Sequence, residues 1–208
     1  MKELNLTNLS RPEAFQTGIS KLVRKTVFKK IHNIREPLLD ACCGNGLFLL
    51  EYCSRTNEYT HLFGVDLDAE ALETAGQLFR DNQLKPPDFL HYDVLDMPFP
   101  ENTFNTIFCL NTLVNIYPFE KIEKIIETLY RLLMPGGVLY IDFRNKNNPV
   151  LNYKYQKNLK HNRLSTHAHR RRDFENILKK IKTQYHNFFP IGSSLPIFTK
   201  GYLLEVRK

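Results

Sequence analysis

The apolar residues of this chain follow two patterns that alternate along its length. Short runs of apolar residues, typical of strands buried inside a parallel sheet, are separated by stretches in which apolar residues recur every three or four positions. The second pattern is typical of amphipathic helices and is clearest over residues 119–133. The short runs predict strands at residues 38–42, 61–67, 88–94, 104–110, 138–143, 183–189 and 198–206.

Strands that alternate with helices predict an α/β fold, because each helix crosses between two parallel strands and covers a face of the sheet. We therefore expect a doubly wound, mostly parallel seven-stranded sheet with helices on both faces. The last two strands follow each other directly and are expected to form a C-terminal antiparallel hairpin. No linker rich in proline, glycine or serine divides the 208 residues, so the pattern predicts a single domain over residues 1–208.

Two segments flank this alternation of strands and helices. An amphipathic helix is predicted at about residues 12–34, before the first strand, and a basic segment at about residues 144–172 follows the fifth. Residues 144–182 have a net charge of +10, whereas the rest of the chain has a net charge of −3. The basicity is therefore local, and tyrosines and histidines lie among the cations. Such a segment can bind RNA, bracket a small acidic ligand or form a solvated face.

The cysteines and the apolar runs limit the class of protein. The chain has four cysteines without a C-x-x-C pair, and this pattern fits neither a disulfide framework nor a zinc site. The histidines of the basic segment have no cysteine or carboxylate beside them, so we predict no metal. The N-terminus lacks the apolar run of a signal peptide, and no segment approaches ~20 unbroken apolar residues. We expect a cytoplasmic protein that does not enter a membrane.

Polar residues and glycines follow the first two predicted strands. Asp40, Gly44 and Gly46 lie at the end of the first strand and in the turn after it, and Asp66 lies at the end of the second. The carboxyl ends of parallel strands meet at one edge of the sheet, where such folds bind ligands. Glycines let the backbone approach a ligand closely, and an acid after the second strand can accept the hydroxyls of a ribose. The pattern predicts a nucleoside site.

The same turn distinguishes between nucleoside ligands. A dinucleotide site requires G-x-G-x-x-G, because the third glycine lets the helix approach the strand beside a pyrophosphate. Leu49 occupies that third position here, and Asp40 would repel a pyrophosphate while favouring an ammonium group. S-adenosylmethionine has an adenosine, an ammonium group and no phosphate, so it is the preferred ligand over a nicotinamide dinucleotide.

At this point the chain resembles the class I S-adenosylmethionine-dependent methyltransferases, in particular the small type found in quinone biosynthesis. The resemblance covers roughly residues 36–144 and rests on four blocks in order, at residues 39–46, 64–68, 93–99 and 131–137. It implies a Rossmann-like methyltransferase fold and S-adenosyl-L-methionine as the cofactor. Two departures are present: Cys42 replaces the usual first glycine of the loop, and Asn105 replaces a common aspartate before the fourth strand. Neither removes an expected ligand contact.

The resemblance also implies roles for individual residues. Asp40 and the turn Gly44–Gly46 would bind the methionine end, and Asp66 the ribose. Asp93 would accept the exocyclic amine of adenine, with Val94 beside the ring. Two residues after the fourth strand would lie near the sulfonium. The implied cofactor-binding residues are Asp40, Cys42, Gly44, Gly46, Asp66, Leu67, Asp93, Val94, Asn111 and Thr112.

The sequence is less informative about the methyl acceptor. Methyl transfer from a sulfonium is an in-line displacement from an activated donor, so the enzyme chiefly supplies position and a dry site, and a general base is optional. The resemblance implies that the N-terminal helix and the basic segment recognise the acceptor. Candidates for a general base in that segment are Tyr153, His161 and His167.

A small, acidic metabolite is the favoured acceptor, and RNA is the alternative. DNA is disfavoured, because the fourth strand ends in Leu110-Asn111-Thr112-Leu113 and not in the N-P-P-Y motif of base-amino methyltransferases. A cofactor-binding module without turnover is a third hypothesis. The sequence leaves the oligomeric state open.

Overall fold

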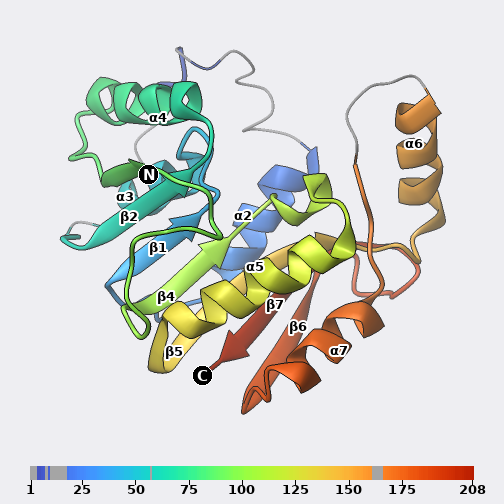
Figure 1. Ribbon diagram of the computed structural model, residues 1–208. Coiled ribbons are helices and arrows are strands. Elements are labelled where there is room, and N and C mark those ends of the chain that lie inside the picture. The colour runs from blue at the N-terminus through green and yellow to red at the C-terminus, as the bar shows by residue number, and fades with distance from the viewer. Residues whose placement is uncertain (1–3, 8, 10–17, 57, 161–165) are drawn as a thin grey trace.

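The computed structural model of the protein describes residues 4–7, 9, 18–56, 58–160 and 166–208, and its strands form one sheet. These strands are β1 Leu38–Ala41, β2 Leu62–Asp66, β3 Asp88–His91, β4 Phe104–Cys109, β5 Leu133–Arg144, β6 Tyr185–Gly192 and β7 Thr199–Arg207. The order across the sheet is β3-β2-β1-β4-β5-β7-β6 (Figure 1). β1 to β5 pair in parallel, and β7 runs antiparallel to β5 and β6. The predicted fold class, with its closing hairpin, is confirmed.

The strand order determines which loops share an edge. β1 lies between β2 and β4, so the chain reverses its direction across the sheet at β1, and this reversal creates a crevice at the carboxyl ends of β1 and β4. β6 is parallel to β5, because β7 is antiparallel to both. The loop from β6 to β7 therefore lies at the same edge of the sheet as that crevice.

Helices cover both faces of the sheet. They are α2 Gly18–Lys30, α3 Leu47–Cys53, α4 Ala69–Asp81, α5 Phe119–Leu132, α6 Pro149–Lys160 and α7 Arg171–Lys180, with a 3-10 turn η1 at Leu113–Asn115. One hydrophobic cluster joins the sheet to α5 and α7, and a second joins the opposite face to α2, α3 and α4 (Figure 1). Adjacent residues of β1 alternate between them, since Leu38 belongs to the second cluster and Leu39 to the first.

Several element boundaries differ from the prediction. The N-terminal helix, expected at about residues 12–34, is described from Gly18 and ends at Lys30, and residues 12–17 lie outside the described residues. Residues 31–36 are not helical, and the last of them, Glu36, precedes Pro37, where helical backbone is disfavoured. The third strand ends at His91, since the Asp93 carboxylate accepts the Leu95 amide at 3.0 Å and starts a turn there.

The starts of β5 and α7 are each stabilised by hydrogen bonds. β5 begins at Leu133, before the predicted start at residue 138, and it includes Gly136 and Gly137 because these two residues exchange backbone hydrogen bonds with Lys208. α7 begins at Arg171, within the basic segment. The Asp173 carboxylate accepts the Arg170 amide at 2.9 Å and stabilises this first turn.

α6 was not predicted as a helix within the basic segment. Asn148 caps it, with its Oδ1 accepting the Leu151 amide at 3.0 Å, and Pro149 is its first residue. Asparagine as cap followed by proline is a helix-start signal that is present in the sequence. Apolar residues are few in α6, and Leu151 is buried.

Candidate functional site

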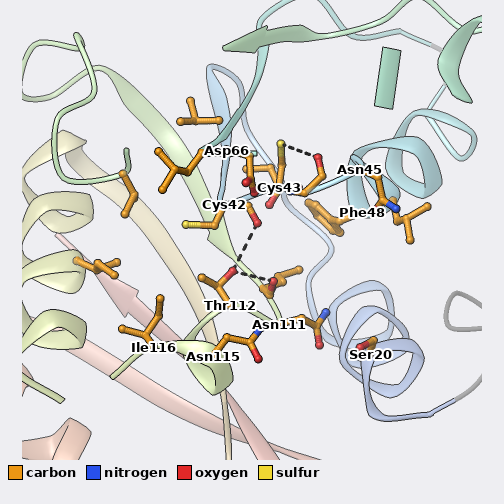
Figure 2. Close-up of a pocket in the computed structure, with 18 of the residues that line it drawn as sticks. Ser20, Cys42, Cys43, Asn45, Phe48, Asp66, Asn111, Thr112, Asn115 and Ile116 are labelled. Carbon is orange, nitrogen blue, oxygen red and sulfur yellow. Dashed lines mark hydrogen bonds between the residues drawn. The ribbon is translucent and has the colours of Figure 1, made fainter. Parts of the chain in front are cut away.

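A cavity of about 600 Å³ opens where β1 and β4 end, a size typical of small-molecule sites. Its walls come from the turns after β1, β2, β3 and β4, together with residues of α2 and α5. Every predicted cofactor-binding residue except Gly46 lines it. Figure 2 shows Cys42, Asp66 and Thr112 gathered from three separate turns around this space.

The turn after β1 is bent by left-handed backbone at alternate residues. Cys42, Gly44 and Gly46 have φ of 59°, 53° and 68°. Glycine adopts this conformation freely, whereas Cys42 adopts it at a cost of roughly 1–2 kcal/mol. The turn is stabilised by the Gly44 amide, which donates to the Asp66 Oδ2 at 2.6 Å, and by the Cys43 amide, which donates to the Val65 carbonyl at 3.0 Å.

Gly46 faces away from the cavity. A Cβ atom there would lie 3.0 Å from the Cβ of Ala75 and 3.1 Å from the ring of Phe89. Gly46 therefore allows the turn to pack against α4 and β3, and its expected role in ligand approach stays a prediction.

Asp66 lines the cavity and also stabilises the turn after β1. Its Oδ2 accepts the Gly44 amide and its Oδ1 accepts the Asp68 amide at 3.0 Å. A carboxylate has about four acceptor sites, so each oxygen can accept a further hydrogen bond from a ligand in the cavity. These two amides orient the side chain that is predicted to bind the ribose.

Asp40 lies deep in the cavity wall. It is the third residue of β1, and only 2% of it is exposed. Burial, and secondly the negative charge of Asp66, raise the pKa of Asp40 well above its usual range. Two carboxylates in one cavity wall favour a positively charged ligand group, because a cation relieves their mutual repulsion.

Arg24 is a cavity residue that was not predicted from the sequence. It is 4% exposed, lines the cavity from α2, and its Nε donates to the Glu51 Oε2 at 2.9 Å. Burial lowers the pKa of Arg24, and the hydrogen bond and charge of Glu51 oppose this effect. Its position between the buried Val23 and Val27 was the signal that could have revealed its burial. The cavity thus combines a guanidinium with carboxylates.

Apolar and aromatic side chains line another part of the cavity. Leu67 and Val94 are the predicted members, and Tyr92, which was not predicted, also lines the cavity. Leu67 is among the most exposed large apolar residues that the structure describes. Apolar surface with a neighbouring acid, Asp93, suits a planar base that has an amino group.

A buried ion pair positions Asn111 at the end of β4. Asn111 has a φ of 60°, its amide donates to the Asp142 Oδ1 at 2.5 Å, and its Oδ1 accepts from the Arg144 Nη2 at 2.8 Å. Arg144 Nη1 also donates to Asp142, and both residues are almost completely buried. Burial raises the pKa of Asp142, against the opposing effect of Arg144.

Thr112 links two of the turns around the cavity. Its hydroxyl lies 3.2 Å from the Leu110 carbonyl and 3.5 Å from the Cys42 carbonyl, so it spans the ends of β4 and β1 (Figure 2). Asn115 of η1 and Lys121 of α5 are further polar residues of the lining. Neither was predicted from the sequence.

The candidate general bases do not line this cavity where the structure describes them. Tyr153 lies on α6 with 74% of its surface exposed. The His167 ring stacks on Tyr117 with ring centroids 5.1 Å apart, and its amide donates to the Val114 carbonyl at 2.7 Å. His161 lies outside the described residues.

Within residues 4–7, 9, 18–56, 58–160 and 166–208, no three histidines, cysteines or acids are grouped so that they could bind a metal ion. In the same ranges, no helix has the length and apolar character needed to cross a membrane.

Comparison with known proteins identifies relatives of this region. Residues 38–137 match the model of a methyltransferase domain family. A 2-phytyl-1,4-naphtoquinone methyltransferase of Nostoc punctiforme is 31% identical over 115 residues, which are 54% of this chain and 49% of the relative. A demethylmenaquinone methyltransferase of Oceanobacillus iheyensis is 27% identical over 115 residues, 55% of this chain and 47% of the relative. The chain spans about half the length of these relatives.

Solved structures share the fold over nearly the whole chain. A magnesium protoporphyrin IX methyltransferase from Synechocystis superposes with a TM-score of 0.70 at 19% identity, covering 100% of this chain and 90% of that one. A SAM-dependent methyltransferase from Archaeoglobus fulgidus gives 0.71 at 14% identity, with coverages of 98% and 100%. Residues 38–137 are therefore similar to a methyltransferase domain family, and the chain has the Rossmann-like fold that these solved methyltransferases share.

Proposed function

We propose that the protein is an S-adenosylmethionine-dependent methyltransferase. The observation that supports this most strongly is the buried Asp40 beside Asp66 in a cavity that also includes Arg24. An acid can accept from the α-ammonium group of a methionine and a guanidinium can donate to its carboxylate, and this cavity offers both. Binding of a dinucleotide is disfavoured for two reasons. The buried Leu49 stands where a dinucleotide site has its third glycine, so the helix cannot approach the strand as closely as a pyrophosphate site requires. The Asp40 carboxylate would also repel a pyrophosphate.

Each part of the ligand then has a partner in the lining. Asp40 would accept from the ammonium group and Arg24 would donate to the carboxylate. Asp66 would accept the ribose hydroxyls, and Asp93 the amino group of adenine, whose ring would lie against Val94. Asn111 and Thr112 would border the sulfonium, where Thr112 is oriented by the Leu110 and Cys42 carbonyls.

When bound, the cofactor supplies a methyl group on a positively charged sulfur: the acceptor's electron pair forms the new bond to carbon as the carbon–sulfur bond breaks, leaving a neutral thioether. The protein contributes position and the exclusion of water. Ile116 and Ile125 are apolar lining residues that exclude water, and Asn115 and Lys121 are polar lining residues that can orient an acceptor. A general base is optional for this chemistry.

We propose a small-molecule acceptor, with α2 and the basic segment 144–172 as the elements that recognise it. The relatives are named as methyltransferases of phytyl-naphtoquinone and demethylmenaquinone, both quinone-type small molecules. RNA stays the alternative because of the basic segment, and Tyr153, His161 and His167 stay candidates for a general base. A cytoplasmic location also stays a prediction.

Calorimetry tests the cofactor, and radiolabelled transfer tests the reaction. We expect S-adenosylmethionine and its demethylated product to bind, NAD to leave no signal, and labelled methyl to enter a small-molecule fraction of cell extract. NAD binding alone would refute the proposal. Cofactor binding without transfer to any fraction would indicate a binding module, and transfer abolished by ribonuclease would identify RNA as the acceptor.

Substitution of Asp66 by alanine is expected to weaken cofactor binding by about 1–2 kcal/mol, because charge-assisted bonds to the ribose are lost. Asp68→Ala is a matched control: Asp68 caps α4 through the Ala71 amide at 3.1 Å and is absent from the cavity lining. It should lower the melting temperature but leave affinity unchanged. Equal affinities for Asp66→Ala and the native chain by calorimetry would contradict the assignment of Asp66.

A further inference from the structure

We propose that the loop between β6 and β7, together with the start of α6, binds the surface of an anionic lipid bilayer. The binding surface, which we call the apolar–basic patch, consists of Val150, Tyr153, Leu195, Ile197 and Phe198 with the cations Lys146, Lys154 and Lys200. This surface is separate from the proposed cofactor cavity, because none of these residues lines it.

The apolar members of the patch are unusually exposed. Each has more than half of its surface in solvent, from 54% for Ile197 to 74% for Tyr153. A single exposed apolar residue is ordinary, but several large ones grouped together indicate an interaction surface. Five of the nine large apolar residues most exposed in the described chain belong to these two short segments.

Hydrogen bonds connect the two segments that form the patch. The Asn145 Nδ2 donates to the carbonyls of Pro196 and Thr199, both at 3.0 Å, and the Asn148 Nδ2 donates to the Thr199 carbonyl at 3.2 Å. Asn148 in turn caps α6. The loop therefore lies at the start of α6, as the ribbon shows (Figure 1).

The charge of both segments has one sign. Residues 143–172 and 176–204 include no aspartate or glutamate. Lys146, Lys154 and Lys200 are exposed among or beside the apolar residues. Apolar side chains that enter the headgroup region, flanked by lysines that pair with lipid phosphates, are the combination that gives peripheral proteins their affinity for anionic membranes.

The residue types favour a bilayer over RNA. Bases stack on aromatic rings, but Val150, Leu195 and Ile197 are aliphatic and offer no ring for stacking. The patch also lies at the sheet edge that includes the cavity, since β6 ends there and β7 begins there. At about 4.8 Å between strands, β7 and β6 are roughly 10–15 Å from β4 along that edge. Binding would bring this edge of the sheet to the membrane.

Co-sedimentation of the full chain with vesicles tests the proposal. We expect binding to vesicles of phosphatidylcholine with phosphatidylglycerol, weaker binding to phosphatidylcholine alone, and release at high salt. Ile197→Ser with Phe198→Ser should weaken binding at least about tenfold, since apolar burial is lost. Lys154→Gln should weaken it about fivefold on anionic vesicles only.

The experiment includes a matched control variant and tests two other binding partners of the patch, RNA and a second copy of the chain. Tyr185→Ser removes an exposed aromatic at the opposite end of β6 and should leave vesicle binding unchanged. Far-ultraviolet circular dichroism and melting temperatures establish that the variants fold. Absence of vesicle binding would refute the proposal. The refutation would hold if the patch instead binds single-stranded RNA in a polarisation assay. It would hold equally if the patch instead forms a dimer that the double serine variant abolishes. Equal loss of binding in Tyr185→Ser would also refute it.

Discussion

Arg144→Met is expected to destabilise the fold by about 3–5 kcal/mol, the largest effect of any substitution considered for this protein. The reason is that Asp142 would remain buried as a carboxylate without its cation. Asn111 would also lose the hydrogen bond from the Arg144 Nη2, and with it one of the two contacts that stabilise its left-handed backbone. Urea unfolding followed by circular dichroism measures the change.

The effect of Arg144→Met should depend on pH. Burial already raises the pKa of Asp142, and removing Arg144 raises it further. The folded state then binds a proton more readily than the unfolded state, so the free energy of unfolding rises as pH falls through the raised pKa. The deficit relative to the native chain should therefore shrink in acid.

The double variant Arg144→Met with Asp142→Asn separates this explanation from simple loss of packing. An asparagine oxygen can still accept the Asn111 amide, and the uncompensated charge is gone. Most of the lost stability should return, and the pH dependence should disappear. A double variant as unstable as Arg144→Met would show that the arginine acts through packing and not through charge.

Asp40→Asn is expected to weaken cofactor binding by about 2–3 kcal/mol while raising the melting temperature of the ligand-free protein. Affinity falls because a charge-assisted hydrogen bond to the ligand's ammonium group is lost. Stability rises because a buried carboxylate that is repelled by Asp66 becomes neutral. Calorimetry measures the first change and a thermal melt the second. A substitution that raises stability and lowers ligand affinity is what we expect for a charged residue whose function is ligand binding.

The pH dependence of binding gives an independent check on Asp40. The ligand cation requires the ionised carboxylate, so affinity should fall as pH decreases through the raised pKa of Asp40. In Asp40→Asn this slope should be absent. A native chain whose affinity is unchanged from neutral pH into acid would contradict the assignment.

The central part of the fold could be predicted because its signals are local. The apolar runs identified every strand, and the acids and glycines after those strands indicated where the cavity lies. Arg24 was missed because its helix has several cations, and only tertiary packing makes this one buried. Tyr92 was missed for a related reason, since its exposure beside Asp93 depends on where β3 ends.

The interactions between distant residues were beyond sequence reasoning. Asp142 and Arg144 lie in an apolar strand, and nothing local shows that they pair around Asn111, some thirty residues earlier. Nothing local shows either that Gly46 makes room for Ala75 and Phe89, the residues that a side chain at this position would meet. Local patterns indicate which residues matter more readily than they indicate why.

The position of β7 between β5 and β6 has a consequence for synthesis of the chain on the ribosome. β6 is made first, yet it can join the sheet only through β7, which is made later. Until β7 emerges, β5 has an open edge with unsatisfied amides and carbonyls, next to segments that have already been translated. Such an edge is where a nascent chain is most exposed to misassembly, so this interval is when a chaperone would be most useful.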